Sequence, residues 1–159
     1  MRVLIVCTGN ICRSPAVHAA LAEALQAHAE AGEAWARDVE VDSCGLGDWH
    51  AGEAPDRRSR VEGTRRGHQV NHVARGIRPD DWAAELVVAM DHGHVTELRR
   101  RAPAGFDLGR IVLLRSFDPT APAAAELADP YFDTDAAFVV MFDQIAAALP
   151  GLVARCRAG

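Results

Sequence analysis

The run Val3-Leu4-Ile5-Val6-Cys7-Thr8-Gly9-Asn10-Ile11-Cys12-Arg13-Ser14-Pro15 joins a short apolar segment to the beginning of a long helical pattern. Residues 3–6 are continuous, apolar and rich in β-branched side chains, which predicts a buried strand of a parallel sheet. Ser14 is a favourable N-cap, and Pro15 suits the first helical position, where a missing N–H costs nothing. We therefore expect residues 7–13 to form a loop between the C-terminal end of a strand and the N-terminal end of a helix.

This loop has the composition of an anion-binding site that also carries a nucleophile. Unpaired N–H groups and the helix dipole attract an anion at a helix N-terminus, and successive N–H groups can surround a phosphate. The same positive potential favours a thiolate at Cys7, and Arg13 can bind phosphate oxygens with two parallel N–H groups. Gly9 permits a positive φ, and Asn10 tolerates one better than most residues. The predicted phosphate-binding residues are Thr8, Gly9, Asn10, Ile11, Cys12 and Arg13.

The spacing Cys7-x5-Arg13-Ser14 after a predicted strand resembles the signature of protein tyrosine phosphatases. The longer run from Val6 to Pro15, close to the N-terminus, resembles the low-molecular-weight protein tyrosine phosphatase family. The resemblance extends over essentially the whole chain. It implies a phosphatase I-like fold, in which helices cover a four-stranded parallel sheet of order 2-1-3-4 in three αβα layers. It also implies hydrolysis of phosphotyrosine and of small aryl phosphates.

Strand and helix patterns alternate along the rest of the chain. Further strands are predicted at residues 39–44, 85–90 and 110–114. Helices are predicted at residues 16–34, 55–66 and 92–101, and a closing helix from residue 133 to 149. Pro150-Gly151 should interrupt this last helix. The alternation predicts an α/β fold with a parallel sheet covered on both faces, and without a linker residues 1–159 should form one domain.

The composition of the 159-residue chain is that of a globular protein, with 49% hydrophobic and 25% charged residues. A net charge of −5 argues against nucleic acid as the main partner. No apolar run suggests a membrane span and no signal-peptide pattern opens the chain, so we expect a cytoplasmic protein with no membrane partner. We also expect a monomer or weak dimer.

All basic residues are arginines. Their clusters at 57–60, 65–66 and 99–101 are interpreted as solvated helix faces, with a docking surface as the alternative.

A phosphate ester also needs a proton for its leaving oxygen. Asp129 is the predicted general acid, because Pro130 restricts the backbone beside it and Asp129-Pro130-Tyr131 resembles the general-acid loop of the family. The resemblance also implies that Trp49 and Tyr131 wall an aryl-binding cleft, although a loop tryptophan could instead fill a satellite core. The predicted substrate-pocket residues are Ile11, Asp48, Trp49 and Tyr131.

Three further residues are expected to support the loop. Asp91 follows the predicted strand 85–90, at the sheet edge where open α/β folds bind ligands, and it also suits a helix N-cap. The resemblance implies that His72 hydrogen-bonds Asn10, although a loop histidine without such a partner is an alternative. Ser14 is expected to hydrogen-bond the Cys7 sulfur.

These residues predict a two-step reaction without a metal or another cofactor. Cys7 attacks phosphorus, the loop N–H groups and Arg13 stabilise the equatorial oxygens, and Asp129 protonates the leaving phenol. Asp129 then activates water against the phosphocysteine. The expected partner is a phosphotyrosine-containing protein. Cys12 is expected to form a reversible disulfide with Cys7 that shields the nucleophile from overoxidation.

Several alternatives to a tyrosine phosphatase can be stated from the sequence. A thioredoxin-linked arsenate reductase of the same fold would need relay cysteines after the third strand, and residues 90–110 contain none. A phosphoarginine phosphatase would carry Thr in place of Ile11. A silent phosphotyrosine-binding module would lack Cys7, Arg13 or Asp129. The two enzymes remain as the alternative functions.

Overall fold

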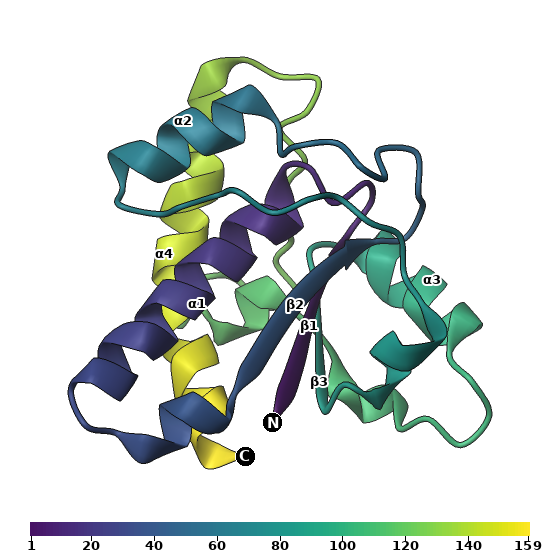
Figure 1. Ribbon diagram of the computed structural model, residues 1–159. Helices are drawn as coiled ribbons and strands as arrows, with labels where there is room; N and C mark the ends of the chain where they lie inside the picture. Colours follow the sequence, from purple (N-terminus) through teal and green to yellow (C-terminus); the bar gives the residue numbers. More distant parts are fainter.

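The computed structural model describes residues 1–159 and is built on one parallel sheet (Figure 1). Its strands are β1 (Arg2–Cys7), β2 (Glu40–Gly45), β3 (Leu86–Ala89) and β4 (Ile111–Leu113). They lie in the order β2-β1-β3-β4, and every neighbouring pair is parallel. The predicted sheet order is therefore confirmed, and β1 ends between its two neighbours at the C-terminal edge.

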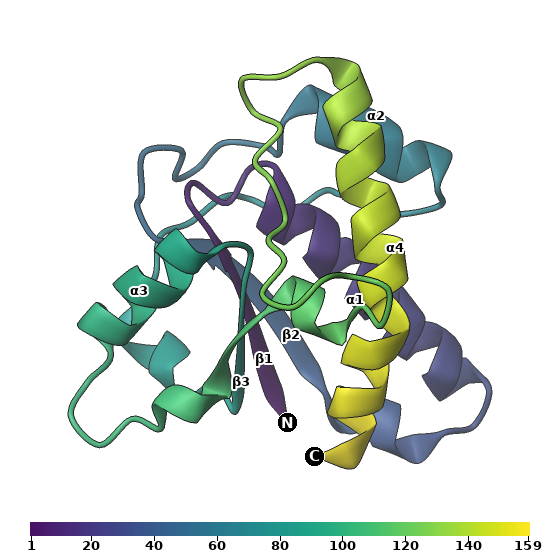
Figure 2. The ribbon, with the colours of Figure 1, turned by 180° about the vertical axis from the view of Figure 1, so that it is seen from behind.

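Helices cover both faces of the sheet (Figures 1 and 2). On one face, α1 (Arg13–Glu30) packs against α4 (Asp135–Ala158), and α2 (Arg57–Arg65) packs against both of them. On the opposite face, α3 (His92–Arg101) packs on β3 and β4. Short 3₁₀ turns occur at Ala34–Asp38, Pro79–Ala83, Leu108–Arg110 and Leu114–Phe117. The predicted three-layer αβα arrangement is confirmed.

Alternation along β1 divides the core into two parts. Val3 and Ile5 belong to the larger cluster, which includes residues of α1 and α4, whereas Leu4 and Val6 belong to the smaller cluster, which includes Leu98 of α3. Successive side chains of a strand point to opposite faces, so one continuous apolar strand supplies both layers. This packing fixes the end of β1 in the middle of the molecule.

The first helix begins earlier than predicted. Its first residue is Arg13 and its N-cap is Cys12, so Ser14 and Pro15 lie inside the first turn instead of at the N-cap and the first position. Pro15 is tolerated there because N–H groups of the first turn have no partner within the helix. The Ser14 hydroxyl instead lies beside the sulfur of Cys7, at the end of β1. The helix ends at Glu30 rather than at residue 34.

The last helix continues through Pro150-Gly151, so the predicted interruption is wrong. Pro150 removes one backbone hydrogen bond, but the buried side chains of Leu152 and Cys156 anchor the last turns in the main core. Contrary to expectation, α4 is also long and apolar enough to cross a membrane by length and composition. In this fold its apolar face packs in the core against α1.

Candidate active site

The loop between β1 and α1 curls around the sulfur of Cys7. The backbone N–H of Asn10 donates to Cys7 Sγ at 3.2 Å, and Ser14 Oγ lies 3.0 Å from the same sulfur. Both groups can donate a hydrogen bond to a thiolate, and such bonds to a charged acceptor are stronger than neutral ones. The loop therefore stabilises negative charge on Cys7.

Asn10 provides the tight turn of this loop. Its φ is +59°, in the left-handed region, whereas Gly9 does not have a positive φ. The expected conformational role of Gly9 is therefore wrong. A Cβ atom at Gly9 would lie 2.7 Å from Cδ2 of His50, because the imidazole packs directly on the loop, so a larger residue here would displace the His50 ring.

The side chain of Asn10 holds the turn in place from inside the protein. Its Nδ2 donates to Ser14 Oγ at 2.8 Å and to Ser43 Oγ at 3.1 Å. Its Oδ1 accepts from the Arg75 N–H and lies 3.1 Å from His72 Nε2. Burial is the main cause that lowers the pKa of His72, which favours a neutral ring donating to Asn10. The structure thus places His72 against Asn10, as the resemblance implied.

Arg13 joins the loop to two other segments at the C-terminal edge of the sheet. Its Nη1 donates to Asp91 Oδ2 at 2.8 Å and to the carbonyl of Leu127 at 3.1 Å. Its Nη2 donates to Asp129 Oδ2 at 2.7 Å and to Thr8 Oγ1 at 3.3 Å. The two predicted carboxylates therefore meet on one buried guanidinium, although they lie far apart in the sequence.

Asp91 combines the two roles that the sequence left open. Its Oδ1 caps α3 by accepting from the His94 N–H at 2.8 Å, and its Oδ2 holds Arg13. Burial raises the pKa of Asp91, but the hydrogen bonds from His94 and Arg13 outweigh burial and lower the pKa overall. An ionised Asp91, which lies outside the cleft lining, fixes the orientation of the Arg13 guanidinium.

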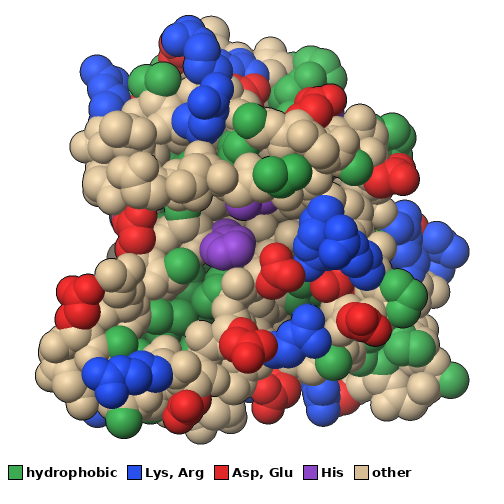
Figure 3. Space-filling model, viewed as in Figure 1, with side chains coloured by type: hydrophobic (Ala, Val, Ile, Leu, Met, Phe, Trp, Pro, Cys, Tyr) green, Lys and Arg blue, Asp and Glu red, His purple; other side chains and the backbone are tan.

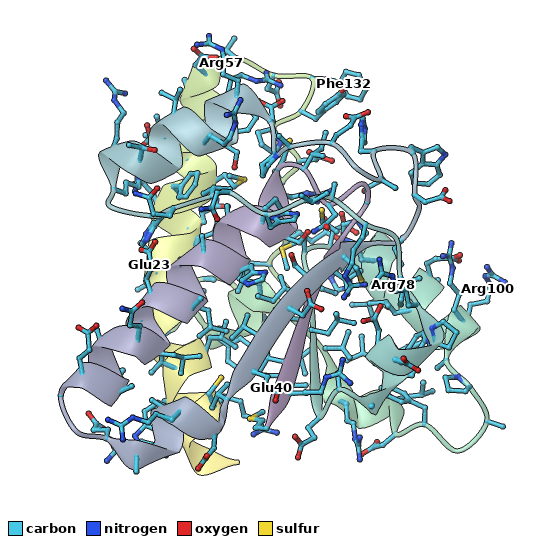
Figure 4. All side chains as sticks on the ribbon, in the orientation of Figure 1. Glu23, Glu40, Arg57, Arg78, Arg100 and Phe132 are labelled. Carbon is cyan, nitrogen blue, oxygen red and sulfur yellow. The ribbon has the colours of Figure 1, made fainter.

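A cleft of about 220 Å³ opens beside the loop. It is lined by Cys7, Thr8, Gly9, Ile11, Cys12, Arg13, Trp49, His50, Asp129, Tyr131 and Phe132. Trp49 is 69% exposed and Phe132, labelled in Figure 4, is 96% exposed, so both rings form the rim of the cleft. This contradicts the alternative in which Trp49 fills a satellite core. Asp48 does not line the cleft and packs beside Gly76 instead, outside the predicted pocket.

One histidine beside the loop, His94, was not predicted as a site residue, whereas the resemblance implied His50 as a polar group at the cleft rim, where the structure has it. Nε2 of His94 lies 2.9 Å from Thr8 Oγ1, and its Nδ1 lies 3.2 Å from Asp91 Oδ1. Burial, followed by the charge of Arg13, lowers the pKa of His94 to about 4, so its ring is neutral at pH 7. The only sequence signal for His94 was its position three residues after Asp91, on the same side of a predicted helix turn.

The cleft therefore brings together a thiol from β1, a cation from α1 and a carboxylate from the segment before α4. The side chain of Asp129 is 43% exposed, so it can contact a molecule in the cleft. No group of three or more His, Cys, Asp or Glu side chains is arranged to hold a metal ion. The arrangement suits transfer of a tetrahedral oxyanion group to sulfur, with proton transfer by Asp129.

Comparisons with known proteins agree with this geometry. The family model described as low molecular weight phosphotyrosine protein phosphatase matches residues 2–158. A low molecular weight protein-tyrosine-phosphatase of Streptomyces coelicolor is 39% identical over 98% of this chain and 93% of its own length. Low molecular weight protein-tyrosine phosphatase A of Mycobacterium tuberculosis is 38% identical over 96% of this chain and 89% of its own length. The crystal structure of a protein tyrosine phosphatase from Entamoeba histolytica superposes with a TM-score of 0.90, at 31% identity, covering 100% of this chain and 98% of that one.

Proposed function

Because the chain belongs to the low molecular weight phosphotyrosine protein phosphatase family, we propose that it hydrolyses phosphotyrosine in protein substrates through a phosphocysteine intermediate. The observation that carries this proposal is the position of the Cys7 sulfur. It accepts a hydrogen bond from the Asn10 N–H and lines the same cleft as Arg13 and Asp129. A phosphoryl group held by the loop would lie against the sulfur.

The first step transfers the phosphoryl group to sulfur. The Cys7 thiolate attacks phosphorus opposite the ester oxygen, a P–S bond forms, and the P–O bond to the phenol breaks. Loop N–H groups and Arg13 stabilise the negative charge of the equatorial oxygens, which is the main requirement of phosphoryl transfer. Asp129 gives its proton to the leaving oxygen, so a neutral phenol departs.

The second step returns the enzyme to its starting state. Asp129, now ionised, takes a proton from water while the water oxygen attacks phosphorus and the P–S bond breaks. The products are inorganic phosphate and the Cys7 thiolate, which Ser14 Oγ stabilises as it leaves. Asp129 accepts a bond from Arg13 in the structure, so it must exchange this bond for one to the substrate during the cycle.

The shape and lining of the cleft favour an aryl phosphate as substrate. The apolar side chain of Ile11 forms part of its wall, and Trp49 and Tyr131 offer rings at the rim on which a phenyl group can stack. Against arsenate reduction, Cys44 and Cys156 are buried in the two cores and cannot relay a disulfide from the cleft. Nothing in the lining favours phosphoarginine or arsenate over phosphotyrosine.

Hydrolysis of para-nitrophenyl phosphate and of a phosphotyrosine peptide tests this function. We expect the wild-type chain to hydrolyse both compounds and Cys7→Ser to hydrolyse neither, while Cys156→Ser, remote from the cleft, keeps wild-type activity. The Cys7→Ser protein should also retain phosphotyrosine proteins from a lysate, which phosphopeptide sequencing would identify. Wild-type protein without phosphatase activity, or undiminished activity in Cys7→Ser, would reject the assignment.

We further propose that residues 1–159 act as one domain, in the cytoplasm, as a monomer or weak dimer. Contacts between distant parts of the chain support the single domain, because α4 packs on α1 and the N-terminal ammonium donates to the carbonyl of Asp38. Light scattering coupled to size-exclusion chromatography would measure the mass, and cell fractionation would locate the protein. A stable higher oligomer or recovery in the membrane fraction would contradict this proposal.

A further inference from the structure

Helix α2 carries a group of arginines that the proposed chemistry does not use. Arg57 and Arg60 are exposed, and neither forms an ion pair within the protein. Arg65 lies 3.5 Å from Glu62 but keeps 73% of its side chain exposed. Figure 3 shows basic side chains gathered at the top of the molecule, over α2. Their charge is therefore available to a partner.

These arginines share one helix face. Residues three, four, seven and eight positions apart lie on the same side of an α-helix, which brings Arg57, Arg60 and Arg65 together. A shallow groove of about 440 Å³ follows this side. We call it the α2 arginine face; it consists of Arg57, Arg60, Val61, Thr64 and Arg65. The lining of this groove includes the apolar Val61 and no acidic residue, whereas Glu62 and Asp135 line the neighbouring groove on the other side of Arg57 and Arg65.

The α2 arginine face is unfavourable for the helix itself. Like charges three and four residues apart destabilise a helix, and cations are disfavoured at its N-terminal end by the helix dipole. The first turn of α2 contains no acidic residue, and the N-cap carboxylate of Asp56 is occupied by Arg58. Arg57 and Arg60 therefore stand where helix stability alone would favour acidic side chains, and an external anion would relieve their repulsion.

Helix α2 is attached directly to the active-site cleft. The guanidinium of Arg58 donates to the carbonyls of Tyr131 and Asp133 at 2.9 and 2.8 Å. Ser59 Oγ donates to the carbonyl of Cys12 in the phosphate-binding loop at 3.1 Å. In Figure 4, Arg57 on α2 and Phe132 at the cleft rim lie on neighbouring elements. The N-terminal turn of α2 therefore lies next to the rim of the cleft.

The two sides of the cleft rim also differ in the charged side chains that they carry. The loop on its other side carries Glu53, whose carboxylate is 59% exposed and paired with His50 of the cleft lining. A peptide across the cleft therefore passes from the side of Glu53 toward the arginines of α2, next to which Asp133 and Asp135 are also exposed.

From this surface we propose that the α2 arginine face binds an acidic segment of the substrate, a run of Asp or Glu residues next to the phosphotyrosine. The inference rests on the proposed function and deepens it, because it names the class of phosphotyrosine protein that the enzyme selects. The small phosphate ester para-nitrophenyl phosphate is too short to reach this face.

Two phosphotyrosine peptides of equal length test the proposal, one with Asp and Glu beside the phosphotyrosine and the other with Asn and Gln in their place. We expect kcat/KM for the acidic peptide to be about 3- to 10-fold higher, through KM, as two or three exposed ion pairs would give. The preference should shrink as sodium chloride screens the charges. In R57Q/R60Q the values of kcat/KM for the two peptides should become equal. In the same variant, kcat/KM for para-nitrophenyl phosphate serves as the control that shows whether the cleft is intact.

Arg99→Gln is the matched control, because Arg99 on α3 is an exposed arginine without a carboxylate partner. The Arg99→Gln variant should prefer the acidic peptide as strongly as the wild type does. Equal rates on the two peptides in wild type, or an unchanged preference in R57Q/R60Q, would overturn the proposal. So would binding of wild type, but not R57Q/R60Q, to phosphatidylserine vesicles together with no peptide preference, since the face would then serve a membrane. Fluorescence anisotropy of both peptides with the Cys7→Ser protein measures the binding preference without turnover. If the wild type proves inactive, the proposed function is rejected. The anisotropy comparison then still decides whether the α2 arginine face binds the acidic peptide more tightly.

Discussion

Arg13 and Asp129 form a 2.7 Å ion pair in the cleft, and this pair bears on the proposed role of Asp129 as general acid. A carboxylate bound to a guanidinium cannot give a proton, so a substrate phosphate must draw Arg13 toward its own oxygens before Asp129 can act. Asp129→Asn keeps the size of the side chain and removes the transferable proton. We expect kcat/KM to fall about 100-fold or more for phenyl phosphate, and much less for a dinitrophenyl ester, whose phenolate leaves without help.

A series of aryl phosphates with leaving groups of increasing acidity measures this difference. The slope of log kcat/KM against leaving-group acidity should become steeper in Asp129→Asn than in the wild type. A uniform loss across the series would mean that Asp129 only binds Arg13 and transfers no proton.

His94 links the stability of the fold to pH. Burial, then the charge of Arg13, lowers its pKa from 6.5 in a free side chain to about 4. The unfolded chain therefore binds a proton more readily, and the stability that the neutral ring provides is present above pH 6.5 and is lost as the pH falls toward 4. Between pH 7 and pH 5 this loss amounts to about 2 kcal/mol.

The variant His94→Gln tests this linkage, because glutamine can still hydrogen-bond Thr8 but does not titrate. Urea unfolding at pH 7 and pH 5 should show a smaller pH-dependent loss of unfolding free energy in His94→Gln than in the wild type. Equal losses in the two proteins would assign the acid sensitivity to other groups.

Cys12 lines the same cleft as Cys7 and is expected to protect it from oxidation. Burial, followed by the charge of Asp56, raises the pKa of the Cys12 thiol, so it remains protonated while Cys7 reacts. Peroxide would oxidise Cys7 to a sulfenic acid, and condensation with the Cys12 thiol would release water and form a disulfide. The four cysteines are free in the structure, so the disulfide stays a prediction.

After brief peroxide treatment we expect dithiothreitol to restore the activity of the wild type and of Cys156→Ser, but not of Cys12→Ser. Mass spectrometry should find a Cys7–Cys12 disulfide in the wild type and Cys7 sulfonic acid in Cys12→Ser. Sulfonic acid in the wild type, with no disulfide, would exclude the protective role.

At the level of elements, α4 shows why a local pattern can mislead. Pro150-Gly151 is typical of a helix end, yet the helix continues because Leu152 and Cys156 gain burial in the main core. The glycine has a separate explanation, since a Cβ atom at Gly151 would collide with the carbonyl oxygen of Phe117. Close approach of α4 to the 3₁₀ turn after β4 therefore requires glycine at this position.

This contact predicts the sign of a stability change. In a free helix Gly→Ala stabilises by about 1 kcal/mol, but here the collision should make Gly151→Ala destabilising by about 1 to 3 kcal/mol. Ala146→Gly, at an exposed position of the same helix, is the control and should cost about 1 kcal/mol from propensity alone. Thermal or urea unfolding measures both variants, and a more stable Gly151→Ala protein would show that α4 and the turn can separate without cost.

For the molecule as a whole, the sequence predicts the parts of the site that follow from local pattern. The apolar strand ending at Cys7 and the loop up to Arg13 follow from local pattern, whereas the sheet order and the role expected of Asp129 follow from the family resemblance of these segments. Contacts made across the chain are not encoded locally: the His72–Asn10 contact was implied only by the resemblance, and the contacts of His94 were not predicted. The bond between Thr8 and His94 joins residues 86 positions apart. The Ser14 hydroxyl does not cap the helix but lies 3.0 Å from the Cys7 sulfur, the contact that was expected of it.

The same long-range contacts should couple the binding of an oxyanion to the stability of the whole fold. The phosphate-binding loop is tied to β2 through Asn10 and Ser43, and to the start of α3 and the segment before α4 through Arg13. An anion that binds only the folded loop, such as orthovanadate, should add about 2.7 kcal/mol at 100 times its Kd, a rise of roughly 5 to 10 °C in Tm. Sodium chloride of equal ionic strength is the control for screening, and Arg13→Lys, which lacks the two-pronged donor, should show a smaller rise than the wild type. If sodium chloride raises Tm as much as orthovanadate does, the loop does not bind tetrahedral anions, and the proposed phosphoryl transfer has no site in this molecule.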